Sequence, residues 1–206
     1  MKIILLTLLL CLSGLSASTQ HFGLKGGATY ATLRGNDAGN FEYRPGYTFG
    51  GMYQHHFTQQ IGIQTELLYT SKGAINEYRI ASDFIKDKYR LNYLELPVML
   101  HVTTGRVFAD IGPQVSFLAK ARKITDTEPD GGNSEITVKT NITDNPYALD
   151  YSLVAGIGYR AINNIGIEAR YAHGLKKLDD EGNAVGSDRY NSTFYLMVSY
   201  LFLSGE

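Results

Sequence analysis

The stretch YLELPVMLHV, residues 93–102, is apolar enough for a core strand, yet it contains an acidic residue and a proline. Glu95 stands between two leucines, and a buried glutamate is rare unless a counter-charge pairs with it. Pro97 has no N–H to donate to a β ladder, so proline normally lies at an edge or a bulge. Neither residue suits a soluble β-sandwich, and the rest of the chain has to explain both.

The composition favours an all-β protein. The chain of 206 residues is long enough for one ordinary domain or one β-barrel. Its formal net charge of -1 gives no bulk attraction to nucleic acid or to an anionic membrane surface, so no nucleic-acid partner is expected. The 22 glycines and 15 tyrosines are typical of many short strands joined by turns.

The N-terminus is typical of a secretory signal peptide. Lys2 precedes the apolar run of residues 3–10, which is followed by small residues suited to cleavage and is too short to span a bilayer. We therefore expect residues 1–18 to be the signal peptide and residues 19–206 to form one outer-membrane β-barrel domain. Cys11 is the only cysteine, so we expect no disulfide, thiolate metal site or cysteine nucleophile in the mature chain.

Apolar and polar residues alternate with a period of two along most of the mature sequence, which indicates strands rather than helices. In the opening stretch, for example, Leu94, Leu96 and Val98 share one face, and Glu95 and Pro97 lie on the other. The pattern predicts eight strands, at residues 22–33, 47–57, 61–73, 89–102, 106–120, 149–160, 165–174 and 192–202.

The connections between these strands alternate between short and long. Tight turns such as HFTQQ contrast with long polar connections at residues 34–46, 74–88, 121–147 and 175–190. Outer-membrane barrels have short periplasmic turns and long external loops, whereas a Greek-key sandwich has no reason for this regularity. The sequence therefore predicts an eight-stranded antiparallel up-and-down transmembrane β-barrel.

Alternation alone leaves open which face points inward. In a secreted, soluble, lipocalin-like barrel the apolar face would line a cavity for a small apolar ligand, and in a membrane barrel it would meet lipid. The polar face is rich in glycine and has few, mixed charges, which is unlike a solvated surface. Aromatic residues also fall toward the strand ends, as membrane girdles require, at Tyr47, Phe57, Tyr69, Tyr159, Tyr171, Tyr200 and Phe202. These features favour the membrane barrel.

Six segments carry a resemblance to a known family. They are FGLKGGATYATL, GIQTELLYTSKGA, YLELPVML, ADIGPQVSFL, VAGIGYR and GIEARYAHGL, in that order over nearly all of the mature chain. With them the chain resembles the PorT-like small outer-membrane β-barrel domain family of Bacteroidota. The resemblance implies an eight-stranded barrel in the outer membrane, supplies no catalytic motif, and connects one branch of the family with a secretion system that exports and anchors surface proteins.

An eight-stranded barrel is only wide enough inside for side chains, so charges there have to pair. Candidate counter-charges for Glu95 are Lys25, Arg160 and Arg170, and we expect a bulge or a bridging water at Pro97. Asp150 and Arg160 have the alternative of a place at the solvated rim. The predicted lumenal charge network comprises Lys25, Glu66, Glu95, Asp110, Arg160, Glu168 and Arg170.

No catalytic residue, cofactor or metal site is predicted. His55, His56 and His101 adjoin tight turns and are expected at the headgroup level of the periplasmic rim; the neighbouring pair points to opposite strand faces and cannot chelate from one side. His173, near the outer end of its strand, leaves an outer-membrane enzyme acting on lipid as a further alternative.

The predicted function is that of a structural, surface-interaction or secretion-associated protein rather than a wide pore. The expected partners are outer-membrane lipid and, through loops or periplasmic turns, secretion-system or surface proteins. We expect the barrel to be monomeric.

Overall fold

The computed structural model describes residues 20–35, 41–80, 83–128, 136–141, 149–162, 164–177 and 189–202. The predicted signal peptide lies outside these residues, as does most of the connection predicted at 175–190, so both assignments stay predictions. Within the described ranges, no helix has the length and apolar character needed to cross a membrane.

The described part of the chain contains nine strands. They are β1 (Gln20–Arg34), β2 (Phe41–His56), β3 (Ile61–Ile80), β4 (Asp83–Thr104), β5 (Val107–Glu128), β6 (Ile136–Asn141), β7 (Leu149–Ile162), β8 (Ile165–Gly174) and β9 (Tyr190–Leu201).

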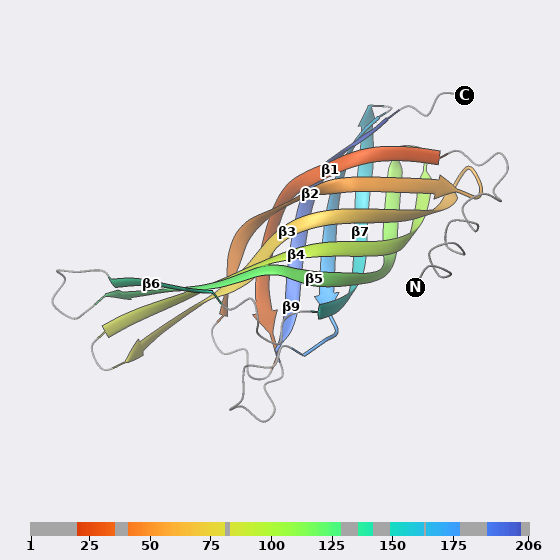
Figure 1. Ribbon diagram of the computed structural model, residues 1–206. Helices are drawn as coiled ribbons and strands as arrows, with labels where there is room; N and C mark the ends of the chain where they lie inside the picture. Colours follow the sequence, from red (N-terminus) through yellow and green to blue (C-terminus); the bar gives the residue numbers. More distant parts are fainter. Residues whose placement is uncertain are drawn as a thin grey trace, which may run out of the picture.

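Eight of these strands form a closed antiparallel ring. Its order is β1-β2-β3-β4-β5-β7-β8-β9, and the pairing of β9 with β1 completes it. Figure 1 shows the strands tilted and curved around a common axis. The predicted eight-stranded up-and-down barrel is therefore confirmed. Gln20 lies opposite His55 and the Phe202 N–H donates to the Phe22 carbonyl at 2.7 Å, so both ends of the described barrel lie at the end with the tight turns, the periplasmic end.

Exposure along β4 shows which face of the barrel points outward. Leu94, Leu96 and Val98 are 39%, 40% and 49% exposed, whereas Glu95 is 0% and Met99 1% exposed. The apolar face is thus outside, where a membrane barrel meets acyl chains, and the polar face lines the interior. The lipocalin-like alternative requires the opposite arrangement.

Aromatic side chains mark both ends of the apolar outer surface. Tyr47 lies toward the external end and Tyr200 toward the periplasmic end, each about half exposed. Neighbouring outward rings pack against one another, as in Tyr171 with Phe194, whose ring centroids are 4.7 Å apart. Such amphipathic rings suit the headgroup level of a bilayer, and the girdle residues predicted from the sequence all lie on the outward-facing surface.

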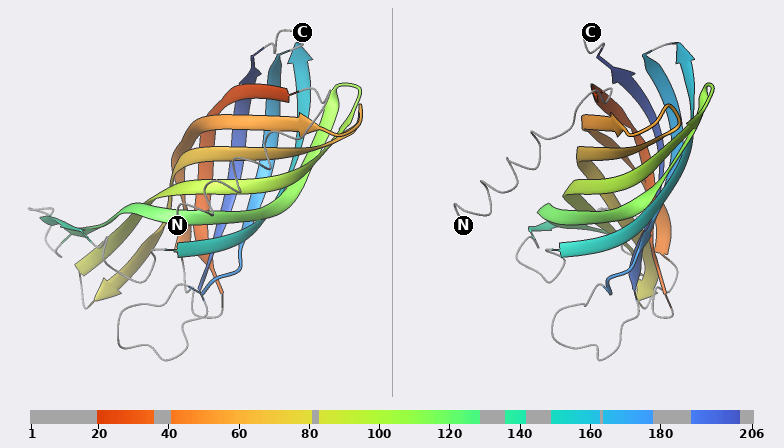
Figure 2. Two further views of the ribbon diagram at one scale, coloured as in Figure 1. Left: turned by 45° about the vertical axis from the view of Figure 1, so that its right-hand side comes forward. Right: turned by 90° about the vertical axis from the view of Figure 1, so that its right-hand side faces the viewer.

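Three of the predicted long loops contain β-structure instead. In the loop predicted at 34–46, β2 already begins at Phe41, and the loops predicted at 74–88 and 121–147 contain longer strand segments. β3 continues to Ile80, β4 begins at Asp83, and β5 continues to Glu128 and pairs with the additional strand β6. Beyond the barrel these strands form a four-stranded projection in the order β3-β4-β5-β6, visible in Figures 1 and 2. We call it the arm, defined as residues 75–80, 83–88, 123–128 and 136–141.

The apolar side chains of the arm, such as Ile75, Phe84 and Ile124, are only partly buried, and its β3, β4 and β5 segments lack strict alternation, which explains why alternation did not reveal the arm. Its side chains are held by ion pairs at its surface: Lys88 lies 2.7 Å from Asp126, Lys123 lies 2.9 Å from Asp87, and Lys86 pairs with Glu77. Backbone pairing with neighbouring strands supplies the rest of its order.

No bulge lies at Pro97, so of the two alternatives predicted there only the bridging water stays a prediction. Pro97 opposes Gln114 and Leu100 opposes Ile111 in one constant register. The register shifts lie elsewhere: at Asn92/Tyr93 between β4 and β5, at Tyr43/Thr48 between β2 and β3, and at Arg160/Ile162 between β7 and β8. A closed barrel has no edge for a proline, and here the ladder accommodates it without an extra residue.

Replacing Val98 by arginine should destabilise the barrel by about 2–4 kcal/mol, because this residue lies midway along the outward apolar run of β4 and a charge at the bilayer midplane is costly. The same change at Val138, which is similarly exposed but belongs to the arm, should alter stability by less than about 0.5 kcal/mol. Urea unfolding in phospholipid vesicles measures both. Equal unfolding midpoints for V98R and V138R would contradict the placement of β4 in lipid.

Candidate functional site

Charged side chains fill the lumen. Period-two alternation turns every second residue of each barrel strand inward, and the inward set carries both signs of charge in a space with little water. The charged residues buried there are Lys25, Glu66, Lys72, Glu95, Asp110, Asp150, Glu168 and Arg170.

The first group, which we call the four-charge cluster, consists of Lys25, Glu66, Glu168 and Arg170. Lys25 Nζ lies 2.5 Å from Glu66 Oε1 and 2.7 Å from Glu168 Oε2. Arg170 donates two N–H bonds to the Glu66 carboxylate, at 2.7 and 2.8 Å, and its Nε donates to Glu168 Oε1 at 2.7 Å. Two cations and two anions leave the cluster neutral, and the bidentate arginine fixes its geometry.

This cluster braces opposite walls of the barrel. Glu66 lies on β3 and Arg170 on β8, strands that are not neighbours in the ring, and Lys25 reaches both acids from β1. Two glutamines continue the network: Gln64 Nε2 donates to Glu66 Oε1 at 2.6 Å and Gln54 Nε2 donates to Gln64 Oε1 at 2.5 Å. The side chains occupy the cross-section that a pore would need.

A second group, the Lys72 cluster, consists of Lys72, Glu95 and Asp150. Lys72 Nζ lies 3.0 Å from Glu95 Oε1 and 3.6 Å from Asp150 Oδ2. Glu95 also accepts hydrogen bonds from the hydroxyls of Thr70, at 2.8 Å, and Tyr195, at 3.1 Å. The glutamate of the opening stretch is therefore fully bonded although none of its surface is exposed.

The counter-charge of Glu95 is Lys72 and not Lys25, Arg160 or Arg170, which corrects the sequence expectation. Lys72 was missed although the alternation of β3 contained the signal. It follows the inward-facing Thr70 by two residues, so parity alone places its side chain in the lumen.

Asp150 and Arg160, for which a place at the solvated rim was the alternative, lie in different surroundings. Asp150 is wholly buried, accepts a hydrogen bond from Asn191 at 2.7 Å, and belongs to the lumen. Arg160 is only partly buried, and no ion pair found among the described residues includes it, so the structure leaves it outside the two clusters.

The histidines near the tight turns point partly into the lumen. His101 Nδ1 lies 2.7 Å from Asp110 Oδ1, and both side chains are buried, so the expectation of a headgroup-level His101 was wrong. It shares the inward face of β4 with Met99 and Glu95. His56, which is half-buried, also faces inward, with its ring centroid 5.4 Å from that of His101. His55 is buried on the outward face, where its ring packs against those of Tyr53 and Phe57. Across the described part of the chain, no group of three or more His, Cys, Asp or Glu side chains is arranged to hold a metal ion.

His173 lies on the outward face of β8, opposite Ser192 of β9. The Tyr171 hydroxyl lies between them, 3.0 Å from Ser192 Oγ and 3.5 Å from His173 Nδ1. A hydrolytic triad also needs a group that orients the histidine, and within the described ranges no carboxylate bonds to His173.

A closed antiparallel barrel with an apolar outside, aromatic girdles and a charge-filled lumen defines the class of integral outer-membrane β-barrel proteins. The chain belongs to the outer membrane protein beta-barrel domain family, whose sequence model matches residues 16–180. It is a protein of the bacterial outer membrane. No curated protein matches the sequence.

Several solved outer-membrane barrels are similar to this chain. Ail of Yersinia pestis, crystallised with the heparin analogue sucrose octasulfate, is 13% identical over 89% of this chain and 99% of its own, with a TM-score of 0.48. Neisserial surface protein A is 13% identical over 88% and 97%, with a TM-score of 0.47. The N-terminal barrel domain of Pseudomonas aeruginosa OprF is 13% identical over 89% and 100%, with a TM-score of 0.35.

Changing Glu66 to glutamine should destabilise the barrel by about 3–5 kcal/mol, because it leaves two buried cations short of a counter-charge. The matched change at Glu77, whose ion pair with Lys86 is partly solvated, should cost less than about 1 kcal/mol. Urea unfolding in vesicles compares the two variants. If E66Q unfolds at the same midpoint as E77Q, the buried cluster does not hold the barrel together.

Proposed function

We propose that this protein is a non-enzymatic, non-conducting barrel that presents its arm to another protein at the cell surface, as a surface-interaction or secretion-associated component. The single observation that carries this proposal is the arm itself: four ordered strands that continue past the membrane-facing surface of a barrel with a filled interior.

The free edge of β6 supports a binding role for the arm. β6 pairs with β5 and ends the sheet order, and all of its described residues are exposed. Among the described strands β6 has a neighbour on one side only, and a partner can add a strand to an edge of this kind. Ile136 and Val138 add apolar surface, each more than half exposed.

The lumen supports a static rather than a conducting barrel. The Glu66–Arg170 pair crosses from β3 to β8, and the Lys72 cluster connects β3, β4 and β7 at another level. Opening a path for water would break several buried charge contacts, each costly to lose. A braced barrel is suited to anchor the arm in a fixed orientation.

The proposed partner class follows from the resemblance to PorT-like barrels of Bacteroidota. Six sequence segments in order support membership of that group, and one of its branches is associated with export and anchoring of surface proteins. We therefore propose an exported surface protein, or a component of the apparatus that delivers it, as the partner of the arm.

A photo-reactive amino acid placed at Ile136 or Val138 in living cells should cross-link to a protein, because these exposed side chains belong to β6, the last strand in the sheet order of the arm. The same amino acid at Leu196, an outward residue of β9, should cross-link to lipid only. Mass spectrometry of the adducts identifies the partner. The proposal would be refuted if Leu196 gave protein adducts as strong as those from the arm. It would also be refuted if the arm gave no protein adducts.

A further inference from the structure

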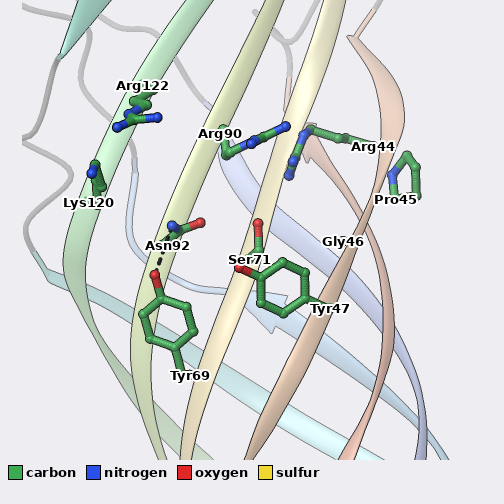
Figure 3. Close-up of a pocket in the computed structure, with 10 residues that line it drawn as sticks. All are labelled: Arg44, Pro45, Gly46, Tyr47, Tyr69, Ser71, Arg90, Asn92, Lys120 and Arg122. Atoms are coloured by element: carbon green, nitrogen blue, oxygen red, sulfur yellow. Dashed lines mark hydrogen bonds between the residues drawn. The ribbon is translucent and has the colours of Figure 1, made fainter.

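A cationic cavity lies outside the barrel wall, where the register shift between Tyr43 and Thr48 leaves residues 44–47 of β2 without ladder partners on β3. Its volume is about 490 Å³, and Figure 3 shows the side chains that line it. The lining includes four cations and two aromatic rings: Arg44, Arg90, Lys120, Arg122, Tyr47 and Tyr69.

The cations of this cavity repel one another. Arg90 lies directly opposite Arg122 in the β4–β5 ladder, and like charges at such positions are destabilising. Figure 3 shows the Arg44 side chain reaching toward Arg90. Lys120, two residues before Arg122, lies on the same face of β5.

These cations also lack protein counter-charges among the described residues. No ion pair found there includes Arg44, Arg90, Lys120 or Arg122. In the neighbouring arm, by contrast, the lysines at positions 86, 88 and 123 each form an ion pair with an acidic residue. Four cations gathered around a cavity without acids favour an anionic ligand.

The position of the cavity identifies which anion reaches it. Asn92 Nδ2 donates to the Tyr69 hydroxyl at 2.9 Å, and Leu94, the next outward residue of β4, already belongs to the apolar band. The cavity is at the end of the barrel away from the tight turns, which is the external end. It therefore opens at the headgroup level of the outer leaflet, directly beside the acyl-chain region.

We propose that this cavity binds the phosphorylated sugar headgroup of an outer-leaflet glycolipid, with the acyl chains lying along the outward leucines of β4. Arginine pairs with phosphate in a bidentate manner, and Arg90 with Arg122 presents two such groups side by side. The volume lies in the range of ligand sites and exceeds the need of a lone phosphate. Asn92 Oδ1 has no hydrogen-bond partner among the described residues, and it is able to accept a bond from a sugar hydroxyl.

A soluble polyanion fits these observations less well. Such a ligand would be expected at water-exposed cations beyond the membrane, whereas this cavity is lined by Tyr47, a half-exposed residue of the predicted aromatic girdle. The proposal does not depend on the partner of the arm, since no residue of the cavity's cation set belongs to the arm.

Native mass spectrometry of the full mature chain in detergent micelles, titrated with bisphosphorylated lipid A, tests the proposal. The variant R90A/R122A should bind at least about tenfold more weakly than the wild type, because two charge-assisted contacts are lost. The control K86A/K88A removes the same charge from the arm and should bind as the wild type does. Lipid A without phosphates should bind as weakly to the wild type as bisphosphorylated lipid A does to R90A/R122A.

Three further measurements complete the test. K120A should bind lipid A more weakly than the wild type, and R90K/R122K should bind it more tightly than R90A/R122A does. These two variants still test the proposal if R90A/R122A fails to fold. Undiminished binding by R90A/R122A or K120A, or equal binding of dephosphorylated lipid A, would overturn the proposal. Displacement of lipid A by inorganic phosphate or by a soluble sulfated oligosaccharide at equal concentration would overturn it too, because the site would then belong to a soluble anion.

Discussion

Ring closure is the constraint on which the rest of this structure depends. In the hydrocarbon of a bilayer, every backbone N–H and C=O has to find a partner within the protein, so a sheet can cross only if it leaves no edge. The pairings of β4 with β5 and of β9 with β1 leave no edge in the barrel. Once eight strands close, the interior has space for side chains only, and each residue of a strand must face either acyl chains or that narrow interior.

The two faces then follow different chemistry. Outward residues such as Leu96 need only be apolar, because lipid makes no specific contacts with them. Inward residues such as Glu95 cannot be solvated well, so each charge needs a partner at bonding distance, and here Lys72 supplies it. Pro97 is tolerated on the inward face because the neighbouring pairs keep the β4–β5 register. Both unusual residues of YLELPVMLHV therefore suit a barrel wall.

The same strands carry all three features of the molecule. β3, β4 and β5 supply members of the buried charge clusters and of the His101–Asp110 pair, three of the four cations outside the wall, and most of the arm. The fourth cation, Arg44, belongs to the neighbouring strand β2. The proposed binding of lipid and of a surface protein would therefore act on one continuous piece of sheet. Buried ion pairs between opposite walls make that sheet a rigid support.

Period-two alternation was sufficient to predict the number of barrel strands and which residues share a face. Which face points outward, and hence the compartment, needed further signals: the few, mixed charges of the polar face, the aromatic residues toward the strand ends and the alternating lengths of the connections. Alternation could not predict which charges meet, since contacts such as Glu66 with Arg170 depend on the tilt and stagger of strands 104 residues apart in sequence. The described apolar side chains of the arm are not buried, and its β3, β4 and β5 segments do not alternate strictly, so the pattern there was too weak to predict strands. The pairing of Arg90 with Arg122 becomes visible only when the β4–β5 register, with its shift at Asn92/Tyr93, is known.

Nitroxide scanning of residues 93–102, one cysteine at a time in protein whose own Cys11 has been removed, tests the central claim most directly. In bilayers, collision rates with oxygen, which concentrates in lipid, should peak at Leu94, Leu96, Val98, Leu100 and Val102 and fall at each residue between them. Oxygen maxima at Tyr93, Pro97 and Met99 would contradict the account, as would strong collisions of the leucine positions with a water-soluble nickel complex.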